Sequence, residues 1–197
     1  DFIVRGEGEI TMEELMKALL SGGDPGKVPG LACRNGDGEV HIGPARVGFL
    51  EDLEEYPAAH DLLDWPTYRY FPLPEGRLAS VATSRGCNFT CTFCSQQVFW
   101  ERSWRGRDPA KVVAEMEMLY QRYGARTILL TDEYPTASQD RWEEFLDRVI
   151  ALGHEDLHLL METRAADIVR DEHFLGKYRK AGIIHVYVGL EATDQDV

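Results

Sequence analysis

The sequence predicts an α/β fold built around a parallel sheet. Three features from residue 78 onward predict it: short apolar strands alternate with amphipathic helices, each helix ends at a glycine, and polar residues follow each strand. Strands and helices that alternate in this way form parallel sheets with right-handed crossovers. The chain has 197 residues, which is enough for one ordinary domain or two small ones.

The first 50 residues follow a different pattern, in which a strand and a helix precede a hairpin. Residues 1–6 are predicted to form a short apolar strand that ends at a glycine. Thr11 and Glu14 have the spacing of a capping box, and apolar residues then recur at helical spacing. Turn residues at 35–38 predict a hairpin whose second strand is residues 39–42.

Residues 51–77 are predicted to be a linker between the two parts. Four prolines lie between residues 57 and 74, together with several aromatic side chains. Proline also restricts the residue before it, so this segment favours an extended conformation over a regular helix or strand. We expect the linker to pack against another part of the molecule.

The repeated strand–helix unit begins at residue 78. Its predicted strands are residues 78–83, 127–130, 157–161 and 183–190. The first helix begins at Asp108-Pro109, where Asp is a preferred cap and Pro fits the first helical position. The three helices end at Gly124, Gly153 and Gly182. Because ligands bind at the carboxyl ends of the strands in such folds, we expect functional residues there.

The composition excludes several classes of protein. Hydrophobic residues make up 44% of the chain and charged residues 28%, which indicates a globular protein. The formal charge of −13 argues against nucleic acid or an anionic membrane surface as the main partner. No apolar stretch approaches the roughly 18–20 residues needed to span a bilayer, and no signal peptide is visible. Because the chain begins with Asp1 rather than Met, we expect it to be a piece of a longer protein.

Three of the four cysteines are clustered. Cys87, Cys91 and Cys94 lie just after a predicted strand, whereas Cys33 stands alone and is expected to be a small packing residue. Three thiols at this spacing indicate ligands for a soft metal centre in a reducing compartment, such as the cytoplasm. Since a structural zinc or a plain [4Fe–4S] cluster takes four ligands, three thiols leave a position open for chemistry. The alternatives are a zinc site completed by a distant His or by Cys33, and thiols without a ligand role.

The cysteine segment resembles the motif of the radical S-adenosylmethionine (SAM) superfamily. It reads Ser-Arg-Gly-Cys87-Asn-Phe-Thr-Cys91-Thr-Phe-Cys94, including the aromatic Phe93 before the last cysteine. The resemblance implies that the cysteines bind a [4Fe–4S] cluster whose fourth iron chelates SAM. It implies that one electron from the cluster cleaves SAM to a 5′-deoxyadenosyl radical, which abstracts a substrate hydrogen. The implied fold is a TIM-like partial (β/α)6 barrel, of which this chain has the first four strands.

The same resemblance implies roles for residues that follow the other strands. Asp132 and Glu133 stand where the superfamily often has a Gly-Gly-Glu run that contacts the SAM amino group, although this sequence departs from that run. Arg164 is expected to pair with the SAM carboxylate, and Glu191 to accept hydrogen bonds from the ribose hydroxyls. The alternative for each residue is a solvated or interstrand charge at the end of a strand.

The front segment resembles the end of a Rossmann-like cobalamin-binding domain. Residues 4–9 read Val-Arg-Gly-Glu-Gly-Glu and precede an amphipathic helix. Gly6 and Glu7 are the expected cobalamin contacts. The implied organisation is the C-terminal end of a cobalamin-binding domain at residues 1–50, a linker at 51–77, and the N-terminal part of a radical SAM core at 78–197.

Further segments resemble the anaerobic cyclase family that forms the fifth ring of bacteriochlorophyll from magnesium-protoporphyrin IX monomethyl ester. These segments include Cys94-Ser-Gln-Gln, Leu130-Thr-Asp-Glu-Tyr-Pro135, Met161-Glu-Thr-Arg164 and Glu191-Ala-Thr-Asp-Gln195. The resemblance implies an oxidoreductase that uses a [4Fe–4S] cluster, SAM and cobalamin, with an external electron donor and a magnesium-porphyrin substrate. The alternatives are a cobalamin-dependent radical SAM methyltransferase or other tailoring enzyme, and a non-catalytic zinc or iron–sulfur module.

The aromatic and basic residues after the cysteines allow two interpretations. Trp100 and Trp104 offer stacking area for a flat macrocycle, and Arg102, Arg105 and Arg107 offer charge for a propionate. The alternative is an ordinary packing cluster of aromatic and Arg side chains around the cysteine segment.

Overall fold

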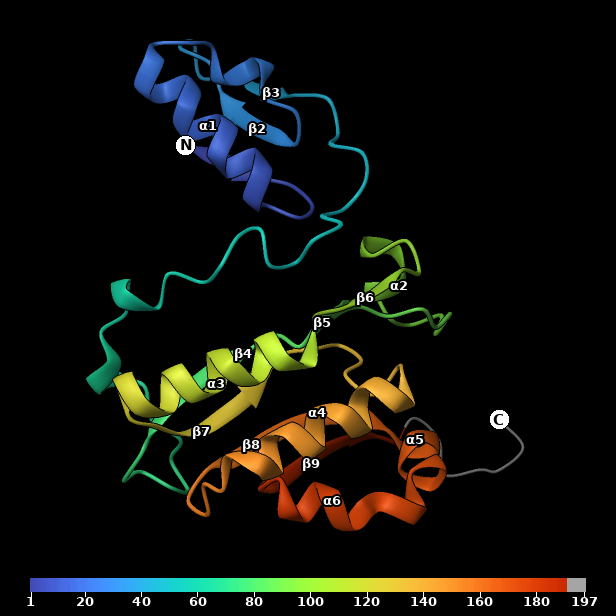
Figure 1. The fold of residues 1–197 in the computed structure, drawn as a ribbon. Coiled ribbons are helices and arrows are strands. Elements are labelled where there is room, and N and C mark those ends of the chain that lie inside the picture. Colours follow the sequence, from blue (N-terminus) through green and yellow to red (C-terminus); the bar gives the residue numbers. More distant parts are fainter. Residues whose placement is uncertain (191–197) are drawn as a thin grey trace. The chain divides into compact units, whose positions relative to one another are not determined.

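The computed structural model describes residues 1–190 and divides the chain into two compact units, Asp1–Pro57 and a second unit that begins at Ala58. The first unit has one sheet and the second has a four-stranded and a two-stranded sheet (Figure 1). Each unit has its own hydrophobic core. None of the helices in this part of the chain has the length and apolar composition that crossing a bilayer requires.

The first unit is an antiparallel sheet with a helix packed on it. Its elements are, in chain order, β1 (Phe2–Val4), α1 (Glu9–Ser21), a 3₁₀ turn (Pro25–Lys27), β2 (Leu31–Arg34) and β3 (Val40–Ile42). The strands lie side by side in the order β1–β2–β3, which confirms the predicted hairpin. Leu15 of α1 packs with Val28 and Leu31 in a small core.

The start of α1 differs from the predicted capping box. The helix begins at Glu9, and no side chain caps it. Thr11 is buried, and its hydroxyl donates to the carbonyl of Pro29 (3.1 Å) while it accepts from Nε of Arg46 (2.9 Å). Arg46 also pairs with Glu14. The prediction was wrong because both residues of the expected box contact partners far along the chain, which local spacing does not show.

The second unit is built on a parallel sheet. Its strands lie in the order β4 (Arg77–Val81), β7 (Ala125–Leu130), β8 (His158–Arg164) and β9 (Ile183–Gly189), and neighbouring strands are parallel. The helices that follow the strands are α3 (Pro109–Tyr123), α4 (Gln139–Leu152), α5 (Ala165–Arg170) and α6 (Leu175–Lys180), with a 3₁₀ turn at Glu172–Phe174 (Figure 1). The α/β fold with a parallel sheet is confirmed.

The core of the second unit lies between the sheet and its helices. The helix residues with no exposed surface are Val112, Met116, Leu119, Trp142, Phe145 and Leu146. Burying a large apolar side chain contributes about 1.5–3 kcal/mol. On β8, Leu159 and Met161 belong to this core, whereas Glu162 and Arg164 alternate with them and are exposed. Because side chains alternate between the faces of a strand, Glu162 and Arg164 lie on the face turned away from the core.

The segment before β4 packs on the second unit. Trp65 is buried and stacks on Tyr123 with ring centroids 4.7 Å apart. Its Nε1 donates to the carbonyl of His60 (2.8 Å), and His60 contacts Glu115 of α3 (2.8 Å). Two 3₁₀ turns form here, at His60–Leu62 and Trp65–Thr67. The predicted linker thus includes residues that are part of the second core.

Three short elements follow β4 that the sequence pattern did not indicate. They are β5 (Ser84–Gly86), α2 (Gln96–Phe99) and β6 (Trp104–Gly106). The two strands pair antiparallel, with Ser84 opposite Gly106 and Gly86 opposite Trp104. Strands of three residues are too short for an alternating pattern to reveal them. The hairpin closes the segment that carries the three clustered cysteines.

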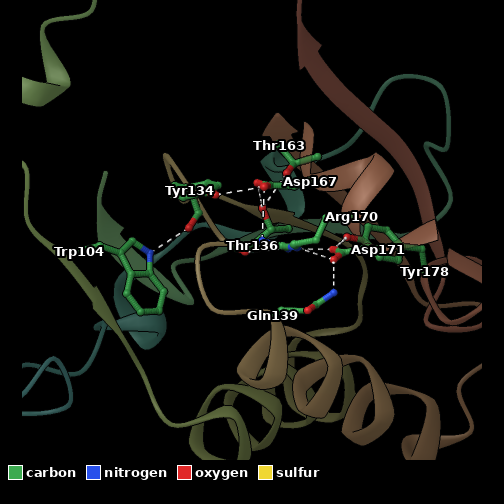
Figure 2. Close-up of polar contacts among 9 residues, drawn as sticks. All are labelled: Trp104, Tyr134, Thr136, Gln139, Thr163, Asp167, Arg170, Asp171 and Tyr178. Carbon is green, nitrogen blue, oxygen red and sulfur yellow. Dashed lines mark hydrogen bonds and ion pairs between the residues drawn. The ribbon is translucent and has the colours of Figure 1, made fainter. Parts of the chain in front are cut away.

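A buried polar network joins the segment after β7 to α5 (Figure 2). Asp167 of α5 accepts hydrogen bonds from the hydroxyls of Thr136 (2.8 Å) and Tyr134 (3.2 Å). The hydroxyl of Thr136 also contacts that of Thr163 on β8 (2.7 Å). Arg170 pairs with Asp167 (3.3 Å) and donates to the carbonyl of Thr136 (3.0 Å). The segment after β7 is therefore anchored from two directions.

Asp171 extends this network toward α6. It is fully buried and accepts from Nε of Arg170 (2.7 Å), Nε2 of Gln139 (3.0 Å) and the hydroxyl of Tyr178 (2.7 Å) (Figure 2). Burial by itself raises the pKa of this carboxyl, but the hydrogen bonds from Arg170 and Tyr178 outweigh it and lower the pKa below the usual value. The folded state therefore favours the ionised form.

Replacing Asp171 with Asn is expected to lower the free energy of unfolding by about 1–3 kcal/mol at neutral pH, because charge-assisted hydrogen bonds are lost. A lowered pKa contributes stability above the unfolded value of about 3.9, and that contribution is lost as the pH falls through the folded value. The difference between wild type and Asp171→Asn should therefore shrink as unfolding is measured from pH 7 down to pH 3. A constant difference over that range would contradict the ionised role.

Candidate metal centre

The three clustered cysteines lie on one loop at the carboxyl edge of the parallel sheet. This cysteine loop, residues 87–103, runs from the end of β5 to the start of β6. The β5–β6 pairing closes its base, and Gly86 immediately before Cys87 has φ +91°. A Cβ atom on Gly86 would lie 2.2 Å from the carbonyl oxygen of Ser103, so only glycine fits between the two ends of the loop.

The cysteines are accessible to a ligand. Cys91 is exposed, Cys87 and Cys94 are half-buried, and all three are free thiols. The amide of Cys94 donates to the carbonyl of Cys91 (3.1 Å), which also accepts from Nε2 of Gln97 (2.6 Å). The ring between them, Phe93, is 70% exposed. Cys33 lies apart in β2 of the first unit, beside its small core.

The Cys87 thiol has a perturbed environment. Burial raises its pKa, and the neighbouring Cys91 and Cys94 raise it further, while a backbone hydrogen bond from Phe89 and the charge of Arg164 oppose the rise. The three free thiols belong to one loop. Since metals bind thiolates, loading this site with metal releases protons.

The donor set fits a cluster better than a single ion. Among residues 1–190, no three His, Cys, Asp or Glu side chains converge on one point as a single ion requires. In an iron–sulfur cluster each thiolate binds a different iron, so the thiolates stand further apart. Three thiols on one loop supply the soft donors that such a cluster takes, one fewer than its four irons.

Arg164 connects the end of β8 to the cysteine loop. Its guanidinium carbon lies 3.4 Å from the ring centroid of Phe89, two residues after Cys87. Phe89 in turn meets the ring of Tyr134 edge-on at 5.1 Å. The predicted pairing of Arg164 with a SAM carboxylate stays a prediction, and the structure places this exposed cation beside the cysteines.

Asp132 anchors the backbone that leads into the loop. It is 2% exposed and accepts from the amide (2.9 Å) and hydroxyl (2.8 Å) of Thr83 and from the hydroxyl of Ser84 (2.5 Å). Burial raises its pKa, although these hydrogen bonds oppose the rise. Both carboxylate oxygens are therefore engaged within the protein.

Glu133 contacts the loop at both ends. Its Oε2 accepts from the amide of Gly86 (3.2 Å) and its Oε1 from Nε1 of Trp100 (3.0 Å). The expected contact of Asp132 and Glu133 with the SAM amino group stays a prediction. In the structure both carboxylates accept hydrogen bonds from the protein itself.

Trp100 of the cysteine loop and Trp104 at the start of β6 are both packed against other side chains. Trp100 is 8% exposed, and Arg105 lies over its ring with the guanidinium carbon 5.5 Å from the centroid. Nε1 of Trp104 donates to the carbonyl of Tyr134 (2.9 Å), and Arg141 lies over the Trp104 ring at 5.7 Å. These contacts favour the packing interpretation of the aromatic and basic residues over a porphyrin-stacking surface.

Glu162 is a candidate site residue that the sequence did not indicate. It lies on the exposed face of β8, opposite Tyr187 of β9. Burial raises its pKa, and the charges of Glu133 and Asp132 raise it further. The alternation of buried and polar residues along residues 157–164 was the available signal, since Glu162 shares its face with Arg164.

The remaining predicted site residues lie in the first unit or outside the described range. Gly6 has φ +77°, and no atom lies within 4 Å of the position that a Cβ would take. Glu7 accepts through Oε2 from the amide of Leu50 (2.7 Å), which joins the two ends of the predicted cobalamin-domain segment. Glu191 falls among residues 191–197, outside the described residues.

Comparisons with known proteins agree with this geometry. The family model of the radical SAM superfamily matches residues 81–197. Two proteins named anaerobic magnesium-protoporphyrin IX monomethyl ester cyclase are similar over 99% of this chain. The one from Rubrivivax gelatinosus is 42% identical and the one from Synechocystis sp. is 39% identical. The chain spans 35% and 38% of their respective lengths.

A solved structure matches over the full chain. The radical S-adenosylmethionine methyltransferase TsrM from Kitasatospora setae, with cobalamin and a [4Fe–4S] cluster bound, superposes with a TM-score of 0.70. The match covers 100% of this chain and 39% of that one, at 23% sequence identity. At that identity the likeness shows the shared fold.

Proposed function

The chain belongs to the radical SAM superfamily, and on that premise we propose that Cys87, Cys91 and Cys94 hold a [4Fe–4S] cluster whose open iron binds SAM. When bound, this cluster supplies the electron that cleaves SAM to a 5′-deoxyadenosyl radical, which abstracts hydrogen from the substrate. The observation that carries the proposal is the set of three free thiols on one loop, whose base is closed by the β5–β6 pairing at the carboxyl edge of the sheet.

The residues around the cysteines have supporting roles in this proposal. Arg164, whose guanidinium carbon lies 3.4 Å from the ring centroid of Phe89, offsets negative charge at the Cys87 thiolate and is proposed for the carboxylate of SAM. Phe93 presents an exposed ring next to Cys94. The Gly86 backbone and the β5–β6 pairing hold the loop closed. Glu191 is proposed for the ribose hydroxyls.

For the whole protein we propose the anaerobic oxidative cyclisation of a magnesium-porphyrin monomethyl ester. The support is the identity of 39–42% to proteins of that name over almost all of this chain. In this proposal residues 1–50 are the end of a cobalamin-binding domain with contacts from Gly6 and Glu7, residues 51–77 are a linker, and residues 78–197 are the radical SAM core. An external electron donor reduces the cluster, and a reducing cytoplasm keeps the thiols free.

A second candidate is a cobalamin-dependent radical SAM methyltransferase, because the chain is also 31% identical, over 98% of its length, to a protein named uncharacterized methyltransferase from Pyrococcus horikoshii. A non-catalytic zinc or iron–sulfur module is less well supported, because the radical SAM family model matches residues 81–197. Catalysis separates all three candidates.

The test is anaerobic turnover of the full-length protein with SAM, cobalamin, a reductant and magnesium-protoporphyrin monomethyl ester. We expect formation of the ring ketone together with 5′-deoxyadenosine, and mass spectrometry detects both products. Transfer of a methyl group without ring closure would indicate the methyltransferase. Zinc uptake without a [4Fe–4S] electron paramagnetic resonance (EPR) signal that SAM perturbs would contradict both enzymes.

A further inference from the structure

Three consecutive residues after β7 contact different parts of the segment that carries the cysteines. Asp132 holds the backbone between β4 and β5. Glu133 contacts the cysteine loop itself. The carbonyl of Tyr134 accepts from Nε1 of Trp104 at the start of β6 (Figure 2). We call Asp132, Glu133 and Tyr134 the clasp.

Glu133 is the member of the clasp that joins the two ends of the loop. One carboxylate oxygen accepts from Gly86, the residue before Cys87, and the other accepts from the indole of Trp100 near the far end. The β5–β6 pairing holds the base of the loop. The loop itself is long, and ordering it costs conformational entropy. A bridging carboxylate offsets that cost and narrows the range of positions that the cysteines occupy.

The flanking residues leave the Glu133 backbone little freedom. Asp132 on one side is almost fully buried. Tyr134 on the other side is 4% exposed, donates from its hydroxyl to Asp167, and packs edge-on against Phe89 of the loop. Beyond it, Thr136 is held by Asp167 and Arg170 (Figure 2). The carboxylate of Glu133 is thus presented to the loop by an anchored segment.

We propose that Glu133 is a positioning residue for the cysteine loop, which sets the spacing of the cysteines through Gly86 and Trp100 before any cofactor binds. This inference rests on the proposed function, because that function assigns an iron–sulfur cluster to the three cysteines of the loop. The role acts through the loop, whereas the contact of Glu133 with the SAM amino group stays an untested prediction.

The experiment compares Glu133→Ala and Glu133→Gln with wild type in the full-length protein, and uses Glu144→Gln as a matched control. Glu144 is an exposed residue of α4 that pairs with Arg148 on the same helix, away from the clasp. The first readout is hydrogen–deuterium exchange at the Gly86 amide in the metal-free protein. The second readout is the rate at which a chelator removes iron after anaerobic reconstitution.

Glu133→Ala is expected to speed exchange at Gly86 by about 10- to 100-fold, because a hydrogen bond to a charged acceptor is lost. The rate at which the chelator removes iron should rise by about 10- to 100-fold, which is the range of affinity lost when residues that orient metal ligands are replaced. Glu133→Gln keeps one carbonyl acceptor and should lie between Ala and wild type. Glu144→Gln should match wild type in both readouts.

Trp100→Phe keeps the proposal testable if Glu133→Ala does not fold. It removes the indole donor and part of the buried ring that Arg105 covers, and it should shift both readouts in the same direction as Glu133→Gln. The double variant Glu133→Gln/Trp100→Phe should show less than the sum of the single effects, because both substitutions act on the same hydrogen bond between residues 100 and 133. Full additivity would overturn the proposed bridge.

Two further outcomes separate this inference from the proposed function. If Glu133→Ala leaves exchange and iron retention unchanged but weakens SAM binding, Glu133 is a cofactor contact and the inference is wrong. If wild type takes up no cluster, the proposed function fails, while exchange in the metal-free protein still decides whether Glu133 holds the loop.

Discussion

Replacing any one of Cys87, Cys91 or Cys94 with Ala is expected to abolish cluster binding and 5′-deoxyadenosine formation in the full-length protein. Replacing residues that merely orient metal ligands already costs about 10- to 100-fold, and a cluster held by three thiolates has no ligand to spare, so we expect a loss of at least about 100-fold. Iron and sulfide per chain, and 5′-deoxyadenosine measured by chromatography, check the result.

Cys33→Ala is the matched control. Cys33 lies in β2 beside the small core of the first unit, and its replacement should leave iron content and SAM cleavage at wild-type levels. A cysteine-loop variant that kept full SAM cleavage would lose its assigned ligand role. A loss of metal in Cys33→Ala would instead revive the alternative of a zinc site completed by Cys33.

The parts of the fold that the sequence predicted are those with a long periodic signal. The strands of the parallel sheet and helices α3 and α4 have apolar residues at regular spacing, and the two helices end at glycines, so local patterns were sufficient. The likeness to TsrM over the whole chain agrees with the expected radical SAM fold. By contrast, β5 and β6 are three residues each and exist because they pair across the cysteine loop.

The candidate site was predictable in its cysteines but not in its supporting contacts. The spacing of three thiols is a local property of the sequence, whereas the partners of Asp132 and Glu133 lie 33 to 49 positions away. Trp100 similarly offered stacking area in the sequence, yet it is buried with its indole donating to Glu133. When a side chain contacts residues that follow a different strand, its role becomes clear only from the three-dimensional structure.

Gly86→Ala is expected to open the base of the cysteine loop and to destabilise the protein by about 3 kcal/mol or more, with loss of the cluster. At φ +91° an alanine is strained by about 1–2 kcal/mol. Its Cβ would also lie 2.2 Å from the carbonyl oxygen of Ser103, which is backbone and moves only if the β5–β6 pairing is disrupted. Denaturant midpoints, amide exchange at Trp104 and iron per chain measure the effect.

Gly124→Ala separates the steric effect from the strain. Gly124 ends α3 with φ +68°, and no atom lies within 4 Å of the position that its Cβ would take. Its replacement should therefore cost only about 1–2 kcal/mol of backbone strain and leave iron content unchanged. The excess loss in Gly86→Ala then reports the contact with Ser103. Equal costs and equal iron content in the two variants would show that closure of the loop base does not depend on the absence of a side chain at residue 86.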